Sequence, residues 1–322
     1  MARIGINGFG RIGRYLVRLM AERNEFPVVI NARADNASLA HLFKYDSVHH
    51  TFKGTVGHDE NGIIINGTHI AVTRCKPNEW QWKDYGVDLV VESTGTIKKR
   101  AGLAEHMACG AKKVIMSAPV SDADITIVMG VNDGLYDPAK HDVVSSASCT
   151  TNCLAPVAKV LNDTFGIEQA LMSTIHAATA KQKAVDARAG RDWRTGRSVL
   201  GNIIPSTTGA AKAVGLVMPE LKGKMTGMSF RVPTNDVSVV DLTARLCTST
   251  TYEEICEAVH QAAAGPMKGI LSYTRDQIVS SDIIGNPHTS ILDETAGIML
   301  NDRFVKLIAW YDNEWGYSNK VL

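Results

Sequence analysis

A glycine-rich turn near the N-terminus constrains the fold of this chain more than any other feature of the sequence. The turn reads Gly8-Phe-Gly-Arg-Ile-Gly13, and it lies between a short apolar run at residues 3–7 and an amphipathic helix predicted from about Arg11 to Arg23. Glycines in this spacing allow a tight turn, close approach of a pyrophosphate to the backbone, and close packing of the helix on the strand. The pattern therefore predicts a dinucleotide site, with the pyrophosphate on the helix N-terminus.

Further short apolar runs continue this pattern as far as about residue 148. A helix is predicted near residues 99–108. Short apolar runs that alternate with helices are typical of βαβ units in a parallel sheet. We therefore predict an α/β Rossmann-type cofactor domain with a parallel sheet. The runs lie at residues 28–30, 88–92, 113–116, 125–129 and 143–145.

The pattern changes after Cys149. Apolar and polar side chains alternate over residues 240–246, which predicts a strand with one buried and one polar face. A helix is predicted to begin at a capping box formed by Thr250 and Glu253 and to end at Gly265. Few other helices are expected between the remaining strands. Those strands are predicted at residues 271–274, 278–282 and 304–310.

These patterns predict two domains. The dinucleotide-binding domain is expected over residues 1–148. The catalytic domain is expected over residues 149–312, as an α+β domain with a mainly antiparallel sheet. The C-terminal segment 313–322 is predicted to return to the first domain.

The charge balance and the cysteines limit the class of protein. The chain has 34 basic and 33 acidic side chains, a net charge of +1, which argues against nucleic acid or a membrane surface as the main partner. No apolar run approaches the roughly 20 residues of a membrane span. Six cysteines without a repeated spacing do not indicate a disulfide framework. Because the first strand begins two residues after Met1, we expect no secretory signal and predict a cytoplasmic protein.

The end of the second strand lacks the acidic residue that binds the ribose of NAD. That residue is expected about 20 positions after the glycines, where this chain has Ala32 followed by Arg33. Without the carboxylate a 2′-phosphate is not repelled, and an arginine can pair with one. Alternatively, Arg33 is an ordinary surface side chain and Asp35 reaches the ribose. These residues favour NADP over NAD.

A cysteine and a histidine form the candidate catalytic pair. Cys149 lies where a strand gives way to a helix predicted to end at Gly166, and His176 lies on a later strand. A helix N-terminus and an imidazole lower the pKa of a thiol toward neutrality, and the thiolate is the nucleophile. Cys153, one turn deeper, is interpreted as packing, and no metal is expected because the ligands are too few. Pro156 implies a kink or a later helix start.

Longer motifs occur throughout the chain, at residues 6–14, 44–47, 146–156, 202–215, 230–234 and 310–318. Together they resemble the phosphorylating glyceraldehyde-3-phosphate dehydrogenases. The resemblance implies that the Cys149 thiolate attacks an aldehyde and that His176 acts as general base and stabilises the oxyanion. Hydride would pass to the nicotinamide, and inorganic phosphate would release the thioester as an acyl phosphate.

The resemblance also implies two anion sites and a set of cofactor contacts. Without the resemblance, Thr208 and Gly209 are interpreted as a helix N-cap and Arg231 as part of a structural ion pair. Asn313 would anchor the nicotinamide carboxamide. The attacking phosphate would be held by Ser148, Thr150, Thr208 and Gly209, and the phosphate of the substrate by Thr179 and Arg231. The cofactor would be held by Gly8, Gly10, Arg11, Ile12, Gly13, Ala32, Arg33, Thr94, Ser117, Arg188 and Asn313.

The loop at residues 178–200 would pack against the cofactor site of a neighbouring subunit, which implies a homotetramer. Family members that use NAD usually carry Asp at the position of Ala32, and a glycine or leucine and a proline at the positions of Ala187 and Arg188. These differences imply NADP or dual cofactor use and suit a biosynthetic direction. Lys181 and Ala178 are also unusual and would alter the pocket for the substrate phosphate.

Two other functions remain open on the sequence. An erythrose-4-phosphate dehydrogenase would share the fold and the cysteine, with water in place of phosphate as the acyl acceptor. A non-catalytic relative would use Cys149 beside Cys153 as a redox sensor, although their spacing on one rigid helix is awkward for a disulfide. A nucleic-acid module is not expected, because the chain has no basic stripe.

Overall fold

The computed structural model describes residues 2–190 and 192–322, which divide into two compact units. Met1 and residue 191, the latter within the predicted loop 178–200, lie outside the described residues. The first unit consists of residues up to 127, 134–147 and 318–322; the second consists of 128–133 and 148–317.

The second unit thus includes residues 128–133. The predicted single boundary after residue 148 assigns these residues to the first domain. The segment belongs to the second unit because Gly130 packs closely against Ile270: a Cβ at Gly130 would lie 2.8 Å from Ile270 Cδ1.

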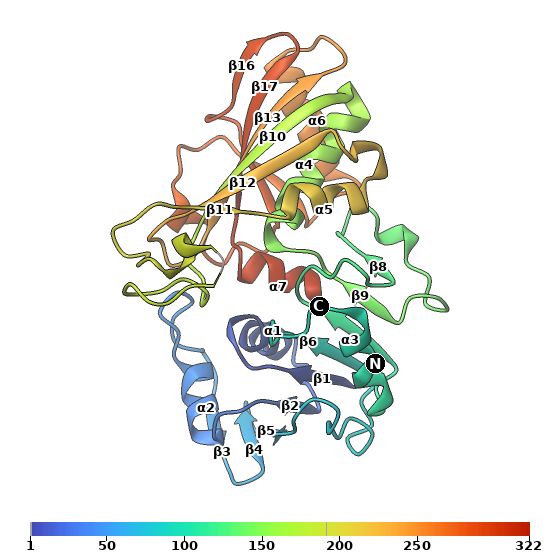
Figure 1. Cartoon of the computed structure of the whole chain (residues 1–322), viewed down its shortest axis with the longest axis vertical. Coiled ribbons are helices and arrows are strands. Elements are labelled where there is room, and N and C mark those ends of the chain that lie inside the picture. The colour runs from blue at the N-terminus through green and yellow to red at the C-terminus, as the bar shows by residue number, and fades with distance from the viewer. Residues whose placement is uncertain (1, 191) are drawn as a thin grey trace. The chain divides into compact units, whose positions relative to one another are not determined.

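The first unit is built on a nine-stranded sheet in the order β3-β4-β5-β2-β1-β6-β7-β9-β8. From β5 to β8 neighbouring strands are parallel, which confirms the predicted Rossmann-type sheet (Figure 1). The helices are α1 (Arg11–Glu22), α2 (Asn36–Lys44) and α3 (Arg100–Ala108), with the 3-10 turn η1 (Asp133–Leu135). The strands are β1 (Ile4–Asn7), β2 (Val29–Asn31), β3 (Val56–His58), β4 (Gly62–Ile65), β5 (Thr68–Thr73), β6 (Leu89–Glu92), β7 (Lys113–Met116), β8 (Ile125–Thr126) and β9 (Val143–Ser145).

The antiparallel edge formed by β3, β4 and β5 was not among the predicted elements. Its central hairpin joins β4 to β5 through Asn66 and Gly67, both with positive φ. An Asn-Gly pair between apolar strands is a strong hairpin signal, because the turn type that fits the strand twist needs two left-handed residues.

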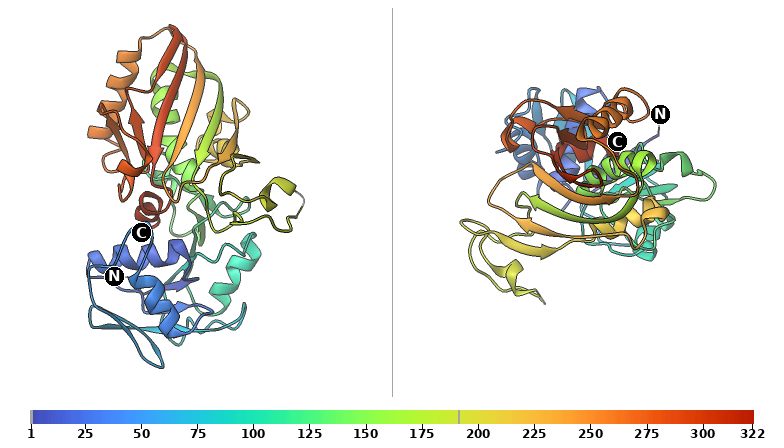
Figure 2. Two further views of the ribbon diagram at one scale, coloured as in Figure 1. Left: turned by 90° about the vertical axis from the view of Figure 1, so that its left-hand side faces the viewer. Right: turned by 90° about the horizontal axis from the view of Figure 1, so that it is seen from above.

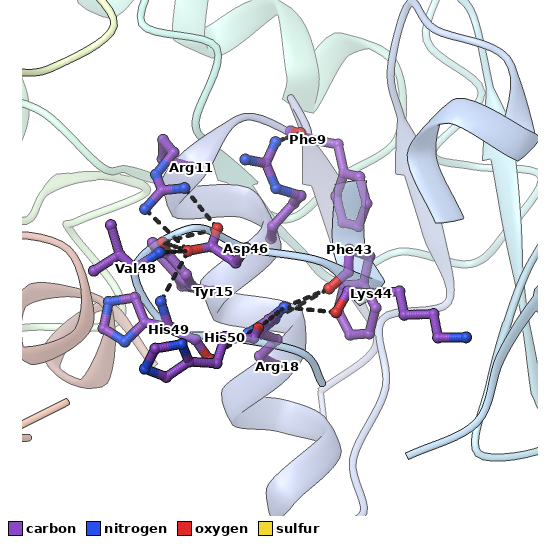
Figure 3. Close-up of polar contacts among 11 residues, drawn as sticks. Phe9, Arg11, Tyr15, Arg18, Phe43, Lys44, Asp46, Val48, His49 and His50 are labelled. Carbon is purple, nitrogen blue, oxygen red and sulfur yellow. Dashed lines mark hydrogen bonds and ion pairs between the residues drawn. The ribbon is translucent and has the colours of Figure 1, made fainter. Parts of the chain in front are cut away.

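A buried arginine joins α1 to the chain that follows α2 (Figure 3). The Arg18 side chain, 4% exposed, donates hydrogen bonds to the carbonyl oxygens of Phe43, Lys44, His49 and His50, the shortest at 2.6 Å to Phe43. Such a guanidinium is held because several fixed acceptors offset the cost of its burial.

Asp46 forms a second contact in the same cluster (Figure 3). Its carboxylate accepts hydrogen bonds from the backbone N–H groups of Val48 and His49 and pairs with Arg11. Burial alone would raise the pKa of Asp46, but these N–H groups and the arginine outweigh it and lower the pKa to about 2. The sequence motif at 44–47 therefore orders the chain beside α1.

Replacing Arg18 by methionine is expected to lower the free energy of unfolding of the first unit by about 2–4 kcal/mol, because the variant leaves carbonyls such as that of Phe43 without a donor. Urea unfolding followed by the fluorescence of Trp80 and Trp82 measures this change. The control Arg100→Met removes only a surface ion pair with Asp124 and is expected to cost about 1 kcal/mol or less. Equal losses in the two variants would contradict the role of Arg18.

The second unit is built on an eight-stranded sheet in the order β11-β12-β10-β13-β17-β15-β14, with β16 beside β17. Most neighbouring strands are antiparallel, as predicted, but β10 pairs with β12 and β14 with β15 in parallel. Helix α4 packs against β13, β15 and β17, and α4 and α6 lie on the same side of the sheet (Figures 1 and 2). The strands are β10 (Ile167–His176), β11 (Ile204–Thr207), β12 (Met225–Arg231), β13 (Ser238–Leu246), β14 (Leu271–Thr274), β15 (Ser290–Asp293), β16 (Ile298–Asn301) and β17 (Phe304–Tyr311).

The helices of this unit correct three expectations. The capping box of α6 is formed by Thr251 and Glu254, one residue later than predicted. Residues 278–282 do not form a strand; a 3-10 turn, η4, lies there instead. Helix α4 passes through Pro156 without the later start that the proline implied. The helices are α4 (Cys149–Phe165), α5 (Ala210–Val217), α6 (Tyr252–Ala264) and α7 (Trp315–Val321), with the 3-10 turns η2 (Trp193–Gly196), η3 (Pro219–Leu221) and η4 (Ser280–Ile283); the last residues of α7 belong to the first unit.

In the described residues, no helix combines the length and apolar character needed to cross a membrane.

Candidate active site

Cys149 is the first residue of α4, and its position is set by the residue before it. Ser148 is the N-cap: its hydroxyl accepts a hydrogen bond from the Thr151 backbone N–H at 3.1 Å. This bond fixes where the helix begins, because it satisfies one of the N–H groups that the first turn leaves unpaired. The thiol of Cys149 consequently lies at the positive end of the helix dipole.

His176 and Arg231 are brought together by strand pairing. They are the last residues of β10 and β12, and the parallel register places them directly beside each other. The Arg231 guanidinium Nη1 lies 2.7 Å from His176 Nδ1, and His176 Nε2 lies 3.5 Å from Cys149 Sγ. The predicted cysteine–histidine pair is therefore within contact distance, and a cation that sequence reasoning had not paired with it completes the cluster.

The electrostatics of the pair differ from the sequence expectation. Burial raises the pKa of the Cys149 thiol to about 11, although the charge of Arg231 acts in the opposite direction. Burial and the same arginine lower the pKa of His176 to about 3. The direction is opposite to the predicted lowering of the thiol pKa, because desolvation has the largest influence on this group.

Tyr311 supports this cluster from β17. Its hydroxyl makes hydrogen bonds of 2.8 Å with Thr150 and 2.9 Å with Thr174, and its ring meets the His176 ring edge-on. The Thr150 hydroxyl, predicted to bind phosphate, is thus already engaged with a tyrosine. Thr150 is also 4% exposed, so its structural role in holding α4 on the sheet is the one that the geometry supports.

Two helix N-termini meet beside Cys149. The Thr151 hydroxyl contacts the Ala210 carbonyl at 3.5 Å, which joins the start of α4 to the start of α5. The Thr208 hydroxyl accepts a hydrogen bond from the Ala210 N–H, and open space surrounds the Cβ position of Gly209. Ser148, Thr208 and Gly209 therefore lie around a region where anions are favoured by both dipoles.

The second predicted anion site contains a buried donor without a partner. The Nε of Arg231 is buried and makes no hydrogen bond with any described residue. Thr179 lies just beyond β10, where its hydroxyl and its N–H both donate to the side-chain oxygen of Gln182. An unpaired buried N–H has a free-energy cost of about 1–3 kcal/mol, so the guanidinium fits an anionic ligand.

Asn313 is held by a short relay that sequence reasoning missed. The Ala177 N–H donates to the Ser238 hydroxyl at 3.0 Å, and this hydroxyl donates to Asn313 Oδ1 at 2.6 Å. The Nδ2 of Asn313 makes no hydrogen bond with a described residue, so its N–H groups remain available. Val237, beside Ser238, has a φ of 63°, a strained value for a β-branched residue. The sequence signal for this relay was Ser238, a small polar residue at a buried position of β13.

The first unit contains a separate pocket of about 310 Å³ at the carboxyl ends of β1, β2 and β6. Ligands of open α/β sheets generally bind at such an edge, outside the carboxyl ends of the strands. The predicted cofactor residues Thr94, Ala32 and Arg33 line it. The remaining lining residues are Asn7, Gly8, Phe9, Gly10, Asn31, Cys75, Pro77, Trp80, Ser93, Thr96 and Ile97.

The space around the three glycines is compatible with the roles predicted from their spacing. Gly8 has a φ of 98°, and a Cβ there would lie 2.8 Å from the Thr94 backbone nitrogen. Nothing lies within 4 Å of a Cβ at Gly10, so this side is open to a ligand. A Cβ at Gly13 would lie 2.1 Å from the Gly8 carbonyl oxygen. Helix α1 has no side-chain cap and no acidic residue in its first turn, so its N-terminus fits a pyrophosphate.

Not every predicted cofactor residue faces this pocket. Because the Arg11 side chain pairs with Asp46, the backbone of Arg11 is the part of this residue that could contact a cofactor. Ser117 donates its hydroxyl hydrogen bond to the Glu92 carbonyl. Ile12 and Gly13 follow the pocket-lining turn on α1, where Gly13 serves packing. Arg188 is exposed and belongs to the second unit.

Asp35, the alternative ribose ligand, already forms the N-cap of α2. Its carboxylate caps α2, accepting hydrogen bonds from the Ser38 N–H at 2.8 Å and the Ser38 hydroxyl at 2.7 Å. These bonds lower the pKa of Asp35. Arg33, in contrast, is exposed and makes no hydrogen bond or ion pair with a described residue. The only charged group that lines the pocket at the end of β2, among the described residues, is therefore a cation.

Comparison with known proteins shows which family the chain belongs to. Residues 2–100 match the family model of the glyceraldehyde 3-phosphate dehydrogenase NAD binding domain, and residues 148–313 match that of the C-terminal domain. The chain is 54% identical to cytosolic glyceraldehyde-3-phosphate dehydrogenase of Chlamydomonas reinhardtii, over 99% of this chain and 94% of that protein. It is also 54% identical to glyceraldehyde-3-phosphate dehydrogenase 1 of Saccharomyces cerevisiae, over 100% and 97% of the two chains. The chain therefore belongs to the glyceraldehyde-3-phosphate dehydrogenase family.

Proposed function

We propose that this protein oxidises glyceraldehyde 3-phosphate to 1,3-bisphosphoglycerate, reversibly, with a nicotinamide dinucleotide and inorganic phosphate. The observation that carries the proposal is the cluster of Cys149, His176 and Arg231, with sulfur and imidazole 3.5 Å apart and a cation 2.7 Å from the same ring. A nucleophile, a base and an anion-binding group are thereby available in one unit. These are the groups needed to add a thiol to a phosphorylated aldehyde, and the nicotinamide cofactor would supply the hydride acceptor for the oxidation to a thioester.

In this proposal Cys149 attacks the aldehyde carbon as His176 Nε2 takes the thiol proton. The resulting imidazolium stabilises the oxygen of the hemithioacetal. When bound, the nicotinamide would supply the acceptor for the hydride that leaves the former aldehyde carbon. Cys149 is left as a thioester, which an attacking phosphate cleaves to release the acyl phosphate and restore the sulfur.

The two anion regions correspond to the two phosphates that this reaction needs. Ser148, Thr208 and Gly209 would hold the attacking phosphate, because two helix N-termini meet there. Thr179 and the unpaired Nε of Arg231 would hold the phosphate of the substrate. Asn313, whose Oδ1 is fixed by Ser238, would present its amide N–H groups to the nicotinamide carboxamide.

We further propose that the cofactor is NADP in preference to NAD. Ala32 supplies no carboxylate to repel a 2′-phosphate, Asp35 is engaged in capping α2, and Arg33 is unpaired at the rim of the pocket. Arginine suits this ligand because its fork of N–H groups matches two phosphate oxygens. Arg188, by the family resemblance, would add a second cation from another subunit.

The double variant Ala32→Asp, Arg33→Leu is expected to weaken NADP binding by about 1–3 kcal/mol, roughly 5–150-fold, because one charged hydrogen bond is lost and a like charge is introduced. NAD binding is expected to be unchanged or tighter. Calorimetric titration of each cofactor measures both. The control Arg23→Leu removes one positive charge from the exposed end of α1, as Arg33→Leu does from the pocket, and is expected to leave both affinities unchanged. An equal loss for the two cofactors would contradict the assignment of Arg33.

Assembly and location are proposed from the family alone. A homotetramer would let the loop 178–200, which projects from the sheet of its own unit (Figure 2), reach a neighbouring subunit. The cytoplasm is proposed because cytosolic relatives are similar to the chain. Sedimentation of the purified protein tests the assembly.

Initial rates of cofactor reduction with and without inorganic phosphate test the proposed reaction. We expect turnover of glyceraldehyde 3-phosphate to depend on phosphate. Phosphate-independent turnover that favours erythrose 4-phosphate would instead support the alternative dehydrogenase. The redox-sensing alternative has no comparable support, because the Cys153 thiol is buried against Ser290 and the Ala309 carbonyl.

A further inference from the structure

A row of polar side chains crosses the carboxyl edge of the sheet in the first unit. Thr73, Asn31, Asn7 and Glu92 are the last residues of β5, β2, β1 and β6, and the parallel register places each directly beside the next. The Thr73 hydroxyl donates to Asn31 Oδ1 at 3.0 Å, and Asn31 Nδ2 donates to Asn7 Oδ1 at 2.8 Å. Asn7 Nδ2 in turn donates to Glu92 Oε2. Every donor in the row therefore points toward Glu92.

The backbone of Cys75 fixes the direction of this row. Its N–H donates to Asn31 Oδ1 at 2.8 Å, and its carbonyl accepts from Asn31 Nδ2 at 3.2 Å. Because a backbone N–H only donates and a carbonyl only accepts, Asn31 cannot lie the other way round without losing both bonds. Asn7 must then present its oxygen to Asn31 and its nitrogen to Glu92.

A histidine of α3 donates to the same carboxylate. His106 is fully buried, with Nε2 3.1 Å from Glu92 Oε2 and Nδ1 3.0 Å from the indole nitrogen of Trp82. An indole N–H only donates, so Nδ1 carries no proton and the proton is on Nε2. His106 is therefore an uncharged donor to Glu92. Its ring also stacks on that of Trp80, which lines the cofactor pocket, at a centroid distance of 3.8 Å.

Thr94 provides two more donors to Glu92. Its backbone N–H donates to Oε1 at 2.8 Å, and its hydroxyl donates to the same oxygen. Glu92 is fully buried, with four donors directed at its two oxygens. Burial alone would raise the pKa of this carboxyl, but the hydrogen bonds from His106, Thr94 and Asn7 outweigh it and lower the pKa.

Only a carboxylate satisfies this set of donors. A glutamine of the same shape would keep one acceptor oxygen and add an amide that donates. With that nitrogen toward Asn7 and His106, the N–H groups of both would lose their acceptor; with the nitrogen toward Thr94, the backbone N–H of Thr94 would lose its own. In either case a residue that lines the cofactor pocket loses a bond that holds it, because Asn7 and Thr94 both line that pocket.

One donor of this network remains available. Asn7 is 3% exposed, and the second N–H of its Nδ2 makes no hydrogen bond with a described residue. The bonds to Glu92 and from Asn31 fix the plane of the amide, so the direction of this N–H is fixed as well. Because Asn7 lines the cofactor pocket, the N–H is available to an oxygen of a bound dinucleotide.

We propose that Glu92 is a positioning residue of the cofactor pocket, whose buried carboxylate holds Asn7 and Thr94 so that Asn7 presents an N–H to an oxygen of the dinucleotide. This inference rests on the proposed function, which assigns the pocket to a nicotinamide dinucleotide. Glu92 does not line the pocket, so it acts through the two residues that do. The network does not include Ala32 or Arg33, so its effect should be equal for NAD and NADP.

Glu92→Gln tests the proposal by calorimetric titration with NAD and with NADP. We expect each dissociation constant to rise about tenfold, the effect of one lost hydrogen bond, while kcat at saturating cofactor stays within about twofold. The control Ile63→Ala creates a cavity at a buried position of β4 that does not line the pocket. It destabilises the same unit and is expected to leave both affinities unchanged. Unchanged affinities in Glu92→Gln, or an equal loss in Ile63→Ala, would overturn the proposal.

NMR of the wild-type protein, labelled with nitrogen-15 in asparagine and histidine, gives a readout that a merely structural role would not move. We expect His106 to be protonated at Nε2 and unprotonated at Nδ1. On saturation with NAD, one of the two side-chain N–H resonances of Asn7, assigned with Asn7→Ser, should move downfield while the other stays. A proton on His106 Nδ1, or Asn7 resonances that NAD leaves unmoved, would overturn the proposal whether or not Glu92→Gln folds.

Cofactor reduction by the wild type separates this inference from the proposed function. Phosphate-dependent turnover, in a protein whose Glu92→Gln variant binds both cofactors as the wild type does, would overturn the inference alone. Weaker binding by Glu92→Gln, in a protein that does not oxidise glyceraldehyde 3-phosphate, would overturn the proposed reaction alone.

Discussion

Cys149→Ser is expected to lower kcat for oxidation of glyceraldehyde 3-phosphate by at least about 10⁴-fold while cofactor affinity is unchanged. A serine hydroxyl at this position is not ionised near neutral pH, and the buried site disfavours its anion further, as it does the thiolate of Cys149. The cofactor pocket of the first unit contains no atom of Cys149, so the binding of NADP or NAD should be unaffected. Steady-state rates and calorimetric titration measure the two quantities.

Cys153→Ser is the matched control, because both cysteines lie on α4 one turn apart. The Cys153 thiol contacts Ser290 and the Ala309 carbonyl rather than His176. Its replacement should therefore retain kcat within a few-fold. Retained turnover in Cys149→Ser, or equal losses in the two variants, would remove Cys149 as the nucleophile.

His176→Asn is expected to lower kcat by about 10²–10⁴-fold. An asparagine can donate a hydrogen bond to the sulfur, but it cannot take the thiol proton or become an acid. The variant should also raise the apparent pKa of Cys149 in the pH profile of alkylation, because the imidazole that lies 3.5 Å from the sulfur, and can carry a positive charge beside the thiolate, is lost. In the wild type the pKa of His176 is about 3, so no histidine step should occur in that profile between pH 5 and 8.

The control for this variant is His58→Asn, an exposed histidine of β3 in the first unit. It should leave both kcat and the alkylation profile unchanged. A His176→Asn variant with an unaltered profile would disprove the pairing of the imidazole with the thiol.

Those parts of the fold that depend on local sequence patterns could be predicted. The turn from Gly8 to Gly13 adopts the geometry that its glycines allow, and α4 runs from Cys149 to its C-cap at Gly166, whose φ is 69°. Alternation of apolar and polar side chains located β13, because one face of that strand is buried. These features depend on neighbours within a few residues, which the sequence shows directly.

The rest depended on contacts between distant residues. The contact of Arg231 with His176 follows from the parallel pairing of β12 with β10, and no local pattern contains that pairing. The pKa of Cys149 also depends on how much water the folded chain removes from the thiol, which neither the helix start nor His176 reveals in the sequence. Asp35 could have bound a ribose, but its capping of α2 is visible only once the helix start is located.

The measurement that tests the central claim most directly is mass spectrometry of the protein mixed with glyceraldehyde 3-phosphate and oxidised cofactor in the absence of inorganic phosphate. We predict that one glyceroyl 3-phosphate group accumulates on each chain, that peptide mapping locates it on Cys149, and that added phosphate removes it. Cofactor reduction without a covalent adduct at Cys149, or an adduct that phosphate does not release, would contradict a thioester mechanism for this protein.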